Sequence, residues 1–142
     1  MILGVGIDIV DVERWARSLG RIQYDVFTAQ ELVDCAERVD RVDALAARFA
    51  AKEACLKALG TGIRGGALRQ IEVLSGPGKA PRIRFAGTLA ARARKARVRR
   101  AHVSLTHERG IAAAIVILEG TRQPARAGRS DFETTSTASR AW

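Results

Sequence analysis

The sequence of 142 residues predicts a single α+β domain in which a largely antiparallel sheet packs on a long central helix. Three observations predict this class. An apolar run rich in β-branched residues opens the chain, a long segment with helical spacing occupies its middle, and short strands around turns dominate its second half. The predicted order of elements is β-α-α-α-β-β-α-β-β.

The first elements are set by apolar runs and by capping signals. A strand is expected over residues 2–9, because the opening segment MILGVGIDIV is almost wholly apolar and reads as a buried strand. A short helix over residues 11–19 should follow and end at Gly20. Thr28, with a glutamate three residues later, forms a capping-box pattern and predicts a second helix that reaches about residue 38.

The central helix is expected to begin with Asp43 as its cap and to end near Leu59, with its apolar stripe facing the core. The later elements are bounded by turn-forming residues and are predicted as strands over 70–74 and 82–85, a helix over 88–97, and strands over 102–106 and 111–119. From Gly120 the composition turns polar and loses periodicity. We therefore expect a domain over residues 1–120 and a disordered tail over residues 121–142.

Composition narrows the setting of the protein. No apolar run approaches the roughly 18 residues that a membrane-spanning helix needs. The first ten residues lack the basic lead-in and small-residue cleavage site of a signal peptide, so none is expected. Cys35 and Cys55 both fall inside predicted helices and have no metal-type spacing, which favours a reduced, cytoplasmic location.

Basic residues give the chain a net charge of +9 and gather in two groups. The first group follows the opening strand and comprises Arg14, Arg17 and Arg21. The second has no acidic residue among its members and comprises Arg82, Arg84, Arg92, Arg94, Lys95, Arg97, Arg99 and Arg100. Such patches favour anionic partners, namely nucleic acid, phosphorylated cofactors or an acidic protein. Few aromatic residues lie near either group, which weakens the case for base stacking.

Two carboxylates lie inside predicted core elements. Asp8 interrupts the opening strand, and Glu53 lies on the inward stripe of the central helix. Buried carboxylates are costly unless they are paired or bound to a cation. Ordinary partners are Arg48 or Arg14 for the first and Lys57 for the second. Taken together, the two carboxylates favour a shared Mg²⁺, which typically binds one or two carboxylates, several waters and substrate phosphate oxygens.

The C-terminal end of the central helix adds groups that suit a phosphate. Lys57 lies one turn beyond Glu53 over the same edge of the helix. Gly60, Thr61 and Gly62 follow, and small residues of this kind allow tight backbone geometry. Either these residues present backbone N–H groups to a nucleotide, or they form a plain helix cap.

Three blocks of the sequence resemble the signatures of holo-acyl-carrier-protein synthases, a family of the 4′-phosphopantetheinyl transferase superfamily. In chain order they are GVGIDIV at residues 4–10, RFAAKEA and KALGTG at residues 48–54 and 57–62, and HVSLTH and AAAIV at residues 102–107 and 112–116. The likeness covers about residues 1–119, and three blocks in the same order are highly specific.

The resemblance implies an enzyme that transfers the 4′-phosphopantetheine arm of coenzyme A to a serine of an apo acyl carrier protein, releasing adenosine 3′,5′-bisphosphate. It implies dependence on Mg²⁺, a role in fatty-acid or polyketide synthesis, and a homotrimer whose active sites lie at subunit interfaces. The carrier protein in such a reaction is acidic.

The resemblance also implies roles for individual residues. Asp8 and Glu53 would be the Mg²⁺ ligands, and Lys57 would bind the pyrophosphate. His107 would bind a phosphate of coenzyme A or assist proton movement, and Arg48 would bind the 3′-phosphate. The nucleotide would also contact the turn, and the carrier would dock on the first arginine group; these residues are Gly60, Thr61 and Gly62, and Arg14, Arg17 and Arg21.

Other interpretations remain open on the sequence alone. The basic groups would suit a nucleic-acid-binding module, and the carboxylates would suit another Mg²⁺-dependent enzyme that cleaves a pyrophosphate. Lys52 lies about 100° around the helix from Glu53, so a structural ion pair is as reasonable for it as a catalytic role. The acceptor of the serine proton would be a water on the metal, His107 or another carboxylate such as Glu31.

Overall fold

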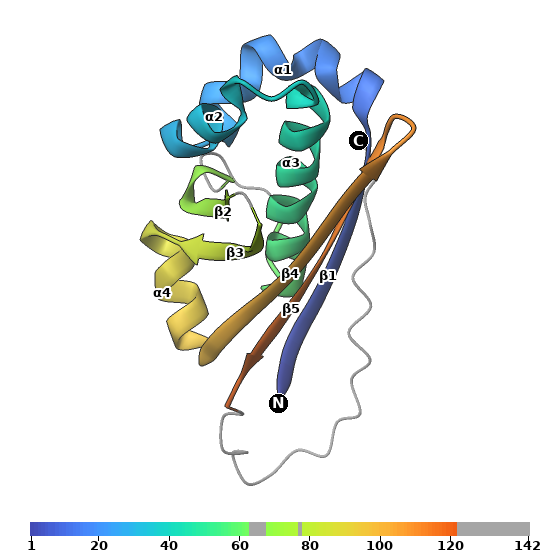
Figure 1. Cartoon of the computed structure of the whole chain (residues 1–142). Helices are drawn as coiled ribbons and strands as arrows, with labels where there is room; N and C mark the ends of the chain where they lie inside the picture. The colour runs from blue at the N-terminus through green and yellow to red at the C-terminus, as the bar shows by residue number, and fades with distance from the viewer. Residues whose placement is uncertain (63–67, 77, 122–142) are drawn as a thin grey trace, which may run out of the picture.

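The predicted order of elements is confirmed by a computed structural model, which describes residues 1–62, 68–76 and 78–121 (Figure 1). The elements are β1 (Ile2–Asp11), α1 (Val12–Val26), α2 (Ala29–Ala36), α3 (Arg41–Ala58), the 3₁₀ turn η1 (Leu68–Gln70), β2 (Ile71–Gly76), β3 (Lys79–Phe85), α4 (Gly87–Lys95), β4 (Val98–Glu108) and β5 (Ile111–Gly120). The predicted tail lies outside the described residues except for Thr121, and its disorder stays a prediction.

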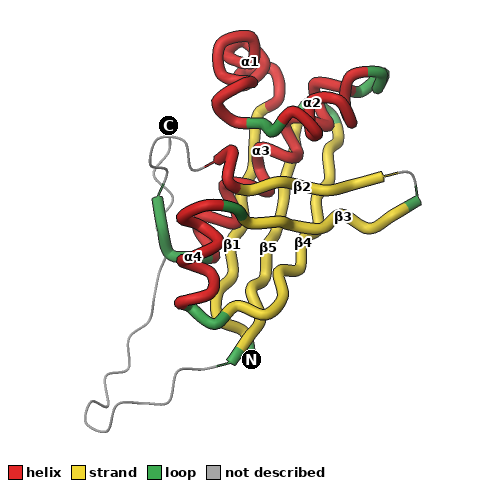
Figure 2. The backbone as a smooth tube through the Cα atoms, turned by 90° about the vertical axis from the view of Figure 1, so that its left-hand side faces the viewer, coloured by secondary structure: helices red, strands yellow, loops and turns green. Residues whose placement is uncertain are grey.

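The strands form two antiparallel sheets, as the predicted α+β class requires. The larger sheet has the order β1-β5-β4, so the first and last strands of the chain are neighbours. The smaller sheet is the β2–β3 hairpin, which runs across the direction of the three long strands (Figure 2). Helix α3 packs on one face of the larger sheet. Helices α1 and α2 lie near the N-terminal end of α3 (Figure 1).

Two glycines of β1 allow this strand to lie directly against α3. A Cβ added at Gly4 would lie 2.0 Å from the carbonyl oxygen of Ala58, and one added at Gly6 would lie 1.9 Å from that of Ala54. Both distances are far shorter than any van der Waals contact, so only glycine fits. Asp8 follows on the same face of β1. The close approach therefore brings its carboxylate towards the helical turn that carries Glu53.

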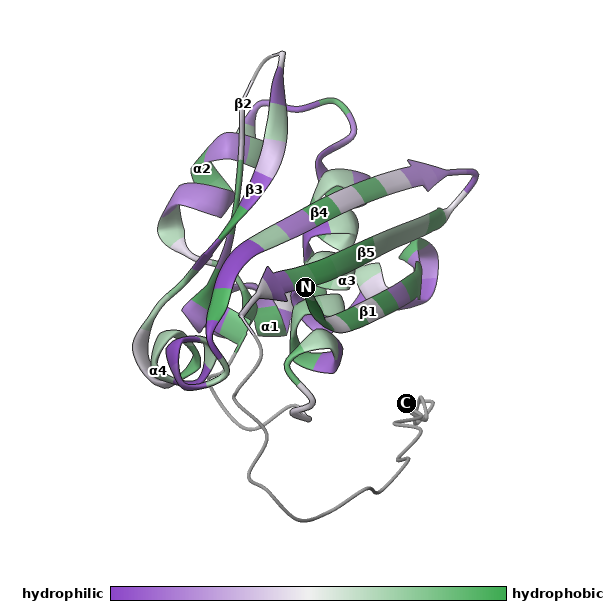
Figure 3. Cartoon of the chain, turned by 90° about the horizontal axis from the view of Figure 1, so that it is seen from below, coloured by the Kyte–Doolittle hydropathy of each residue, from purple (hydrophilic) through white to green (hydrophobic). Residues whose placement is uncertain are grey.

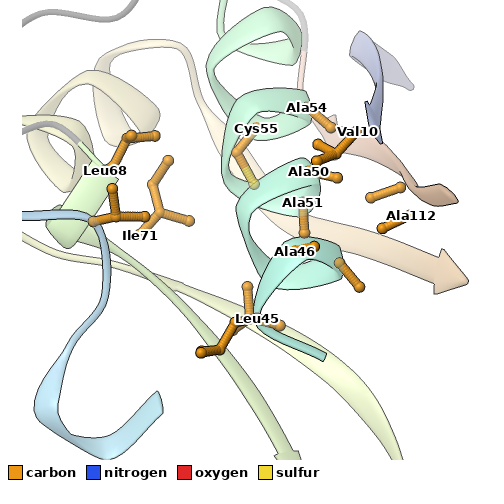
Figure 4. Packing of buried hydrophobic residues seen from close by; sticks show 14 of the residues in the cluster. Val10, Leu45, Ala46, Ala50, Ala51, Ala54, Cys55, Leu68, Ile71 and Ala112 are labelled. Atoms are coloured by element: carbon orange, nitrogen blue, oxygen red, sulfur yellow. The ribbon is translucent and has the colours of Figure 1, made fainter. Parts of the chain in front are cut away.

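Alanines and a few large side chains make the core around α3. On the side of the sheet, Val10 and Ala112 pack against Ala50 and Ala54 (Figure 4). Of the apolar residues predicted to face inward, the two that are fully buried are Leu45 and Leu56, and the half-buried ones are Phe49 and Leu59. Because nearly every face of α3 is covered, its polar residues are also enclosed by protein.

Several predicted boundaries are wrong, among them the start of β3, which lies at Lys79 and not at residue 82. Helix α1 continues through Gly20 to Val26, because the burial of Leu19 and Val26 outweighs the cost of about 1 kcal/mol for a glycine inside a helix. Strand β4 extends over residues 98–108, since it pairs with β5 along its whole length. The N-cap of α3 is Asp40 and not Asp43.

A buried ion pair joins α3 to the elements packed on its other side. The ammonium of Lys52 lies 2.7 Å from Oε2 of Glu31, and both side chains are fully buried. Lys52 also donates to backbone carbonyls of Val26, Leu68 and Ile71. The structural role considered for this lysine is therefore the one that the structure shows. Within the described residues, no helix is both long and apolar enough to cross a membrane.

Candidate active site

Asp8 and Lys57 form the first part of the site. The side chain of Asp8 lies on the α3 side of β1, the same face as the buried Gly6 and Val10. Its Oδ1 lies 2.9 Å from Nζ of Lys57, which also donates to the carbonyl oxygen of Ile7 at 2.8 Å. Burial raises the pKa of Asp8, and the ammonium of Lys57 partly offsets this rise. Lys57 thus links the end of α3 to the edge strand of the sheet.

Glu53 supplies the second carboxylate. Its side chain is only 6% exposed, and its Oε1 is buried with no hydrogen-bond partner among the described residues. Burial, together with the negative charge of Asp8, raises the pKa of Glu53 to about 7, although Lys57 lowers it in part. Gly6 of β1 lies directly against the carbonyl oxygen of Ala54, and Lys57, one helical turn after Glu53, binds Asp8, so both carboxylates lie at the same junction of β1 and α3. The structure therefore brings together the two acidic residues singled out in the sequence.

This donor set fits a hard divalent cation. A buried carboxylate oxygen without a partner, next to a second carboxylate, is an arrangement that a cation would stabilise. Among residues 1–62, 68–76 and 78–121, no cluster of three His, Cys, Asp or Glu side chains could hold a metal. Two carboxylates alone suit Mg²⁺, which takes its other ligands from water and from substrate phosphates.

The raised pKa of Glu53 makes the stability of the metal-free protein depend on pH. Between about pH 4.5 and 7 the folded state binds more protons at this site than the unfolded state, so stability is full below this window and falls as pH rises through it. The shift in the pKa of Glu53 corresponds to a decrease of about 3 kcal/mol in the free energy of unfolding across this window. Glu53→Gln should remove this loss, which urea unfolding at pH 5 and pH 8 in EDTA would measure. An equal loss in both proteins would contradict the assignment.

Arg48 does not form the ion pair with Asp8 that was one of the alternatives for this carboxylate. Its guanidinium is buried and donates to the carbonyl oxygen of Ala44 and to Oγ of Ser75, while its Nε has no partner among the described residues. It lies five residues before Glu53, which places it about 140° around α3. The structure therefore directs Arg48 towards β2 and away from the carboxylate pair, and its role towards a 3′-phosphate stays a prediction.

His107 lies inside β4 and not in the turn after it, because pairing with Ala112 of β5 extends the strand to Glu108. Its Nε2 lies 3.5 Å from Oδ2 of Asp40, which Arg38 also binds. The register of β1, β5 and β4 puts the Cα atoms of His107 and Asp8 about 12 Å apart. His107 therefore lies apart from the carboxylate pair, and no sequence pattern predicted its contact with Asp40.

The turn after α3 is a helix cap. Gly60 has a positive φ of 62°, and its N–H donates to the carbonyl oxygen of Lys57, while the N–H of Thr61 donates to that of Leu56. These two bonds define a Schellman motif. The prediction that Gly60 and Thr61 present their N–H groups to a nucleotide needs correction, because both groups serve the cap. Gly62 follows the cap and is exposed.

The predicted docking arginines lie on one helix. Arg14, Arg17 and Arg21 are exposed on α1, and their spacing of three and four residues places them on one face. Asp11 caps this helix by accepting from the backbone N–H of Arg14, and Arg17 forms an exposed ion pair with Glu13. The helix therefore carries a row of guanidinium groups directly after β1, the strand that contains Asp8.

Comparisons with known proteins agree with this architecture. The family model described as the 4′-phosphopantetheinyl transferase superfamily matches residues 4–116. A holo-acyl-carrier-protein synthase from Treponema pallidum is 48% identical over 125 residues, which cover 84% of this chain and 98% of that protein. The chain belongs to the 4′-phosphopantetheinyl transferase superfamily, and within it to the holo-acyl-carrier-protein synthases.

Solved structures show the same fold. The holo-acyl-carrier-protein synthase from Neisseria meningitidis aligns with a TM-score of 0.76 and 32% identity, covering 84% of this chain and 99% of that one. An ACPS–CoA complex from Chronobacterium ammoniagenes aligns with a TM-score of 0.74 and 28% identity, covering 84% of this chain and 98% of that one. The α+β class predicted from the sequence is thereby confirmed.

Proposed function

We propose that this chain transfers the 4′-phosphopantetheine arm of coenzyme A to a serine of an acidic apo acyl carrier protein, yielding holo carrier protein and adenosine 3′,5′-bisphosphate. The observation that carries the proposal is the pair of buried carboxylates, Asp8 and Glu53, with Lys57 bound beside them. The names of the relatives support this reaction over nucleic-acid binding and over pyrophosphate hydrolysis.

In the reaction, the serine oxygen forms a bond to the β-phosphorus of coenzyme A, and the bond from that phosphorus to the bridging oxygen breaks. Asp8 and Glu53 would hold Mg²⁺, which supplies positive charge to the pyrophosphate oxygens when bound. An ammonium has three N–H donors. Lys57 uses two of them for Ile7 and Asp8, which leaves one to donate to the departing phosphate.

The serine proton needs an acceptor, and the structure narrows the choice. Glu31 is fully buried, accepts from Lys52 and from the backbone N–H of Val73, and so has no route to a substrate. Glu31 is therefore not the base for the serine. Water at the carboxylate pair and His107 remain, and His107 is 30% exposed with Asp40 beside it.

The arginine row on α1 supports docking of an acidic carrier. Three exposed guanidinium groups on one helical face steer an anionic protein and raise its association rate at low salt.

Mass spectrometry of the carrier tests the proposed transfer and this docking surface together. Carrier incubated with coenzyme A and Mg²⁺ should gain the mass of one phosphopantetheine arm. Glutamate at Arg14, Arg17 and Arg21 should raise the KM for carrier and leave that for coenzyme A unchanged.

Two outcomes would overturn this assignment. Unmodified carrier together with cleaved coenzyme A would show hydrolysis instead of transfer. An equal rise in both KM values would place the arginines outside carrier docking.

An exposed apolar face of the larger sheet supports the homotrimer. On the side away from α3, Ile7 and Ile9 are 65% and 69% exposed. The other exposed apolar residues of this face are Val5, Ile111 and Ile115. Figure 3 shows hydrophobic segments along β1 and β5. A contiguous patch of this kind typically marks an interface, and we assign it to contacts between copies of this chain, with active sites near the subunit boundary.

Charge placed on this face should break the assembly. Ile7→Asp would bury a carboxylate between subunits at a cost of several kcal/mol. We expect light scattering after size exclusion to give the mass of three chains for the wild type and of one chain for the variant. Val33→Asp is the matched control, since Val33 is 67% exposed on α2, and it should remain a trimer. Three chains in the Ile7 variant would contradict the interface.

A cytoplasmic location is part of the proposal. It is supported by Cys35 and Cys55, which are both free thiols and both buried. Thiols that stay reduced are typical of proteins in a reducing compartment.

A further inference from the structure

The corner between α4 and β4 carries a basic cavity that the proposed reaction does not use. Helix α4 ends at Lys95, and β4 begins at Val98. The cavity there has a volume of about 260 Å³ and is lined by Arg94, Arg97, Val98, Arg99 and Thr121. Three of these five residues are arginines, so the cavity offers a concentrated set of charged hydrogen-bond donors.

This cavity is remote from the carboxylate pair. Asp8 lies opposite Ala114, which in turn lies opposite Leu105 of β4. Val98 is seven residues before Leu105 on the same strand, a separation of roughly 23 Å. The cavity therefore lies near the opposite end of the sheet and is independent of the transfer site.

Arg97 has a backbone conformation that favours glycine. Arg97 has a positive φ of 59°, and its N–H donates to the carbonyl oxygen of Arg94. Gly60 holds the equivalent position after α3, with a φ of 62°. Glycine adopts this conformation freely, whereas a residue with a Cβ is strained in it. The chain thus has an arginine at the position where the cap of α3 uses glycine.

Local charges do not explain the three arginines. The C-terminal end of α4 favours a cation in its last turn, which accounts for Arg94 but not for Arg97 or Arg99 beyond the helix. In the part of the chain that the structure describes, none of the three guanidinium groups has an ion pair. The neighbouring acid, Glu119, is bound to His102. An unpaired group of like charges around a cavity favours a multivalent anion as its occupant.

We propose that this cavity binds a small phosphate anion of the pyrophosphate type. Its volume is many times the ~30 Å³ that one water occupies, so two linked phosphate groups fit. Guanidinium groups bind phosphate oxygens in a bidentate manner. Free pyrophosphate and the terminal phosphates of a nucleotide share this chemistry. A nucleic-acid strand would need an extended groove with stacking aromatics, whereas the cavity is small and has no aromatic lining.

The test is an NMR titration of the full chain with inorganic pyrophosphate in EDTA, followed at the backbone amides of residues 94–99 and 121. These amides should shift together and saturate. Arg97→Gly keeps the positive φ while it removes the guanidinium, so it should unfold at the same or a higher temperature and bind at least tenfold more weakly. Arg99→Gln should also weaken the binding of pyrophosphate. Lys95→Ala removes a nearby charge that does not line the cavity and should change the affinity less than twofold.

Three results would overturn the proposal. One is unchanged affinity in both Arg97→Gly and Arg99→Gln. Another is an equal loss in Lys95→Ala, which would show a general charge effect. The last is displacement of pyrophosphate by an oligonucleotide at far lower concentration with a steep salt dependence, which would show a nucleic-acid surface. A parallel titration with adenosine diphosphate separates free from nucleotide-borne phosphate. Phosphopantetheine transfer by Arg97→Gly should equal that of the wild type, so this test does not depend on the proposed function.

Discussion

Glu53→Gln should lower kcat for phosphopantetheine transfer by about a thousandfold, and Asp8→Asn should do the same. Each substitution keeps the size of the side chain and removes one negative charge from the pair that would hold Mg²⁺. The pair lies where β1 meets α3, and the Oε1 of Glu53 has no protein partner among the described residues that could compensate. The loss should appear in kcat more than in the KM for the carrier, because the docking arginines lie on α1.

The fold should survive both changes. Glu53→Gln relieves the burial of a charged group, so its melting temperature should match or exceed that of the wild type. Glu108→Gln, at an exposed position of β4, is the control and should retain full activity. Near-normal turnover in either Glu53→Gln or Asp8→Asn would show that the two carboxylates do not act in the reaction.

Lys52→Met should destabilise the protein by about 3–5 kcal/mol, because it leaves Glu31 as an uncompensated charge in the core. Glu31 accepts from Lys52 at 2.7 Å and from the backbone N–H of Val73 at 3.0 Å, and it also caps α2 through Thr28. Removal of the lysine therefore disturbs α2, β2 and the end of α1 at once. Urea unfolding at pH 7 measures the change.

A double variant separates the buried charge from the lost packing. Lys52→Met with Glu31→Gln removes both charges of this buried pair and keeps an acceptor for the N–H of Val73, so it should recover a large part of the stability lost in the single variant. A loss below about 1 kcal/mol for Lys52→Met would mean that Glu31 is protonated or hydrated. In either case the activity of each folded molecule should be unchanged, since Lys52 contacts no part of the carboxylate pair.

The sequence predicts the carboxylate pair well because local signals mark it. A charged residue inside an apolar strand and another on the inward stripe of a helix are both visible without a structure. The partner of Lys52 was not predictable in this way. The capping box identified Glu31 as part of a helix start, but the same carboxylate also binds a lysine from another helix, and only tertiary packing brings them together.

The opening strand shows a different limit. Its continuous apolar run predicts burial on both faces, yet Ile7 and Ile9 are exposed in the single chain while Gly6 and Val10 are buried. The sequence alone pointed to no exposed patch for a trimer contact. The alternation of β1 in the structure supplies one, and it reconciles the apolar pattern with an assembly that would cover the second face.

Binding of Mn²⁺, a spectroscopic substitute for Mg²⁺, tests the central claim most directly. Electron paramagnetic resonance counts the ions bound by wild type, Asp8→Asn and Glu53→Gln at one free concentration and at pH 8, where Glu53 is mostly ionised. We predict one ion per chain for the wild type and almost none for either variant, because both carboxylates belong to one site. Undiminished binding in either variant would contradict a shared cation at Asp8 and Glu53.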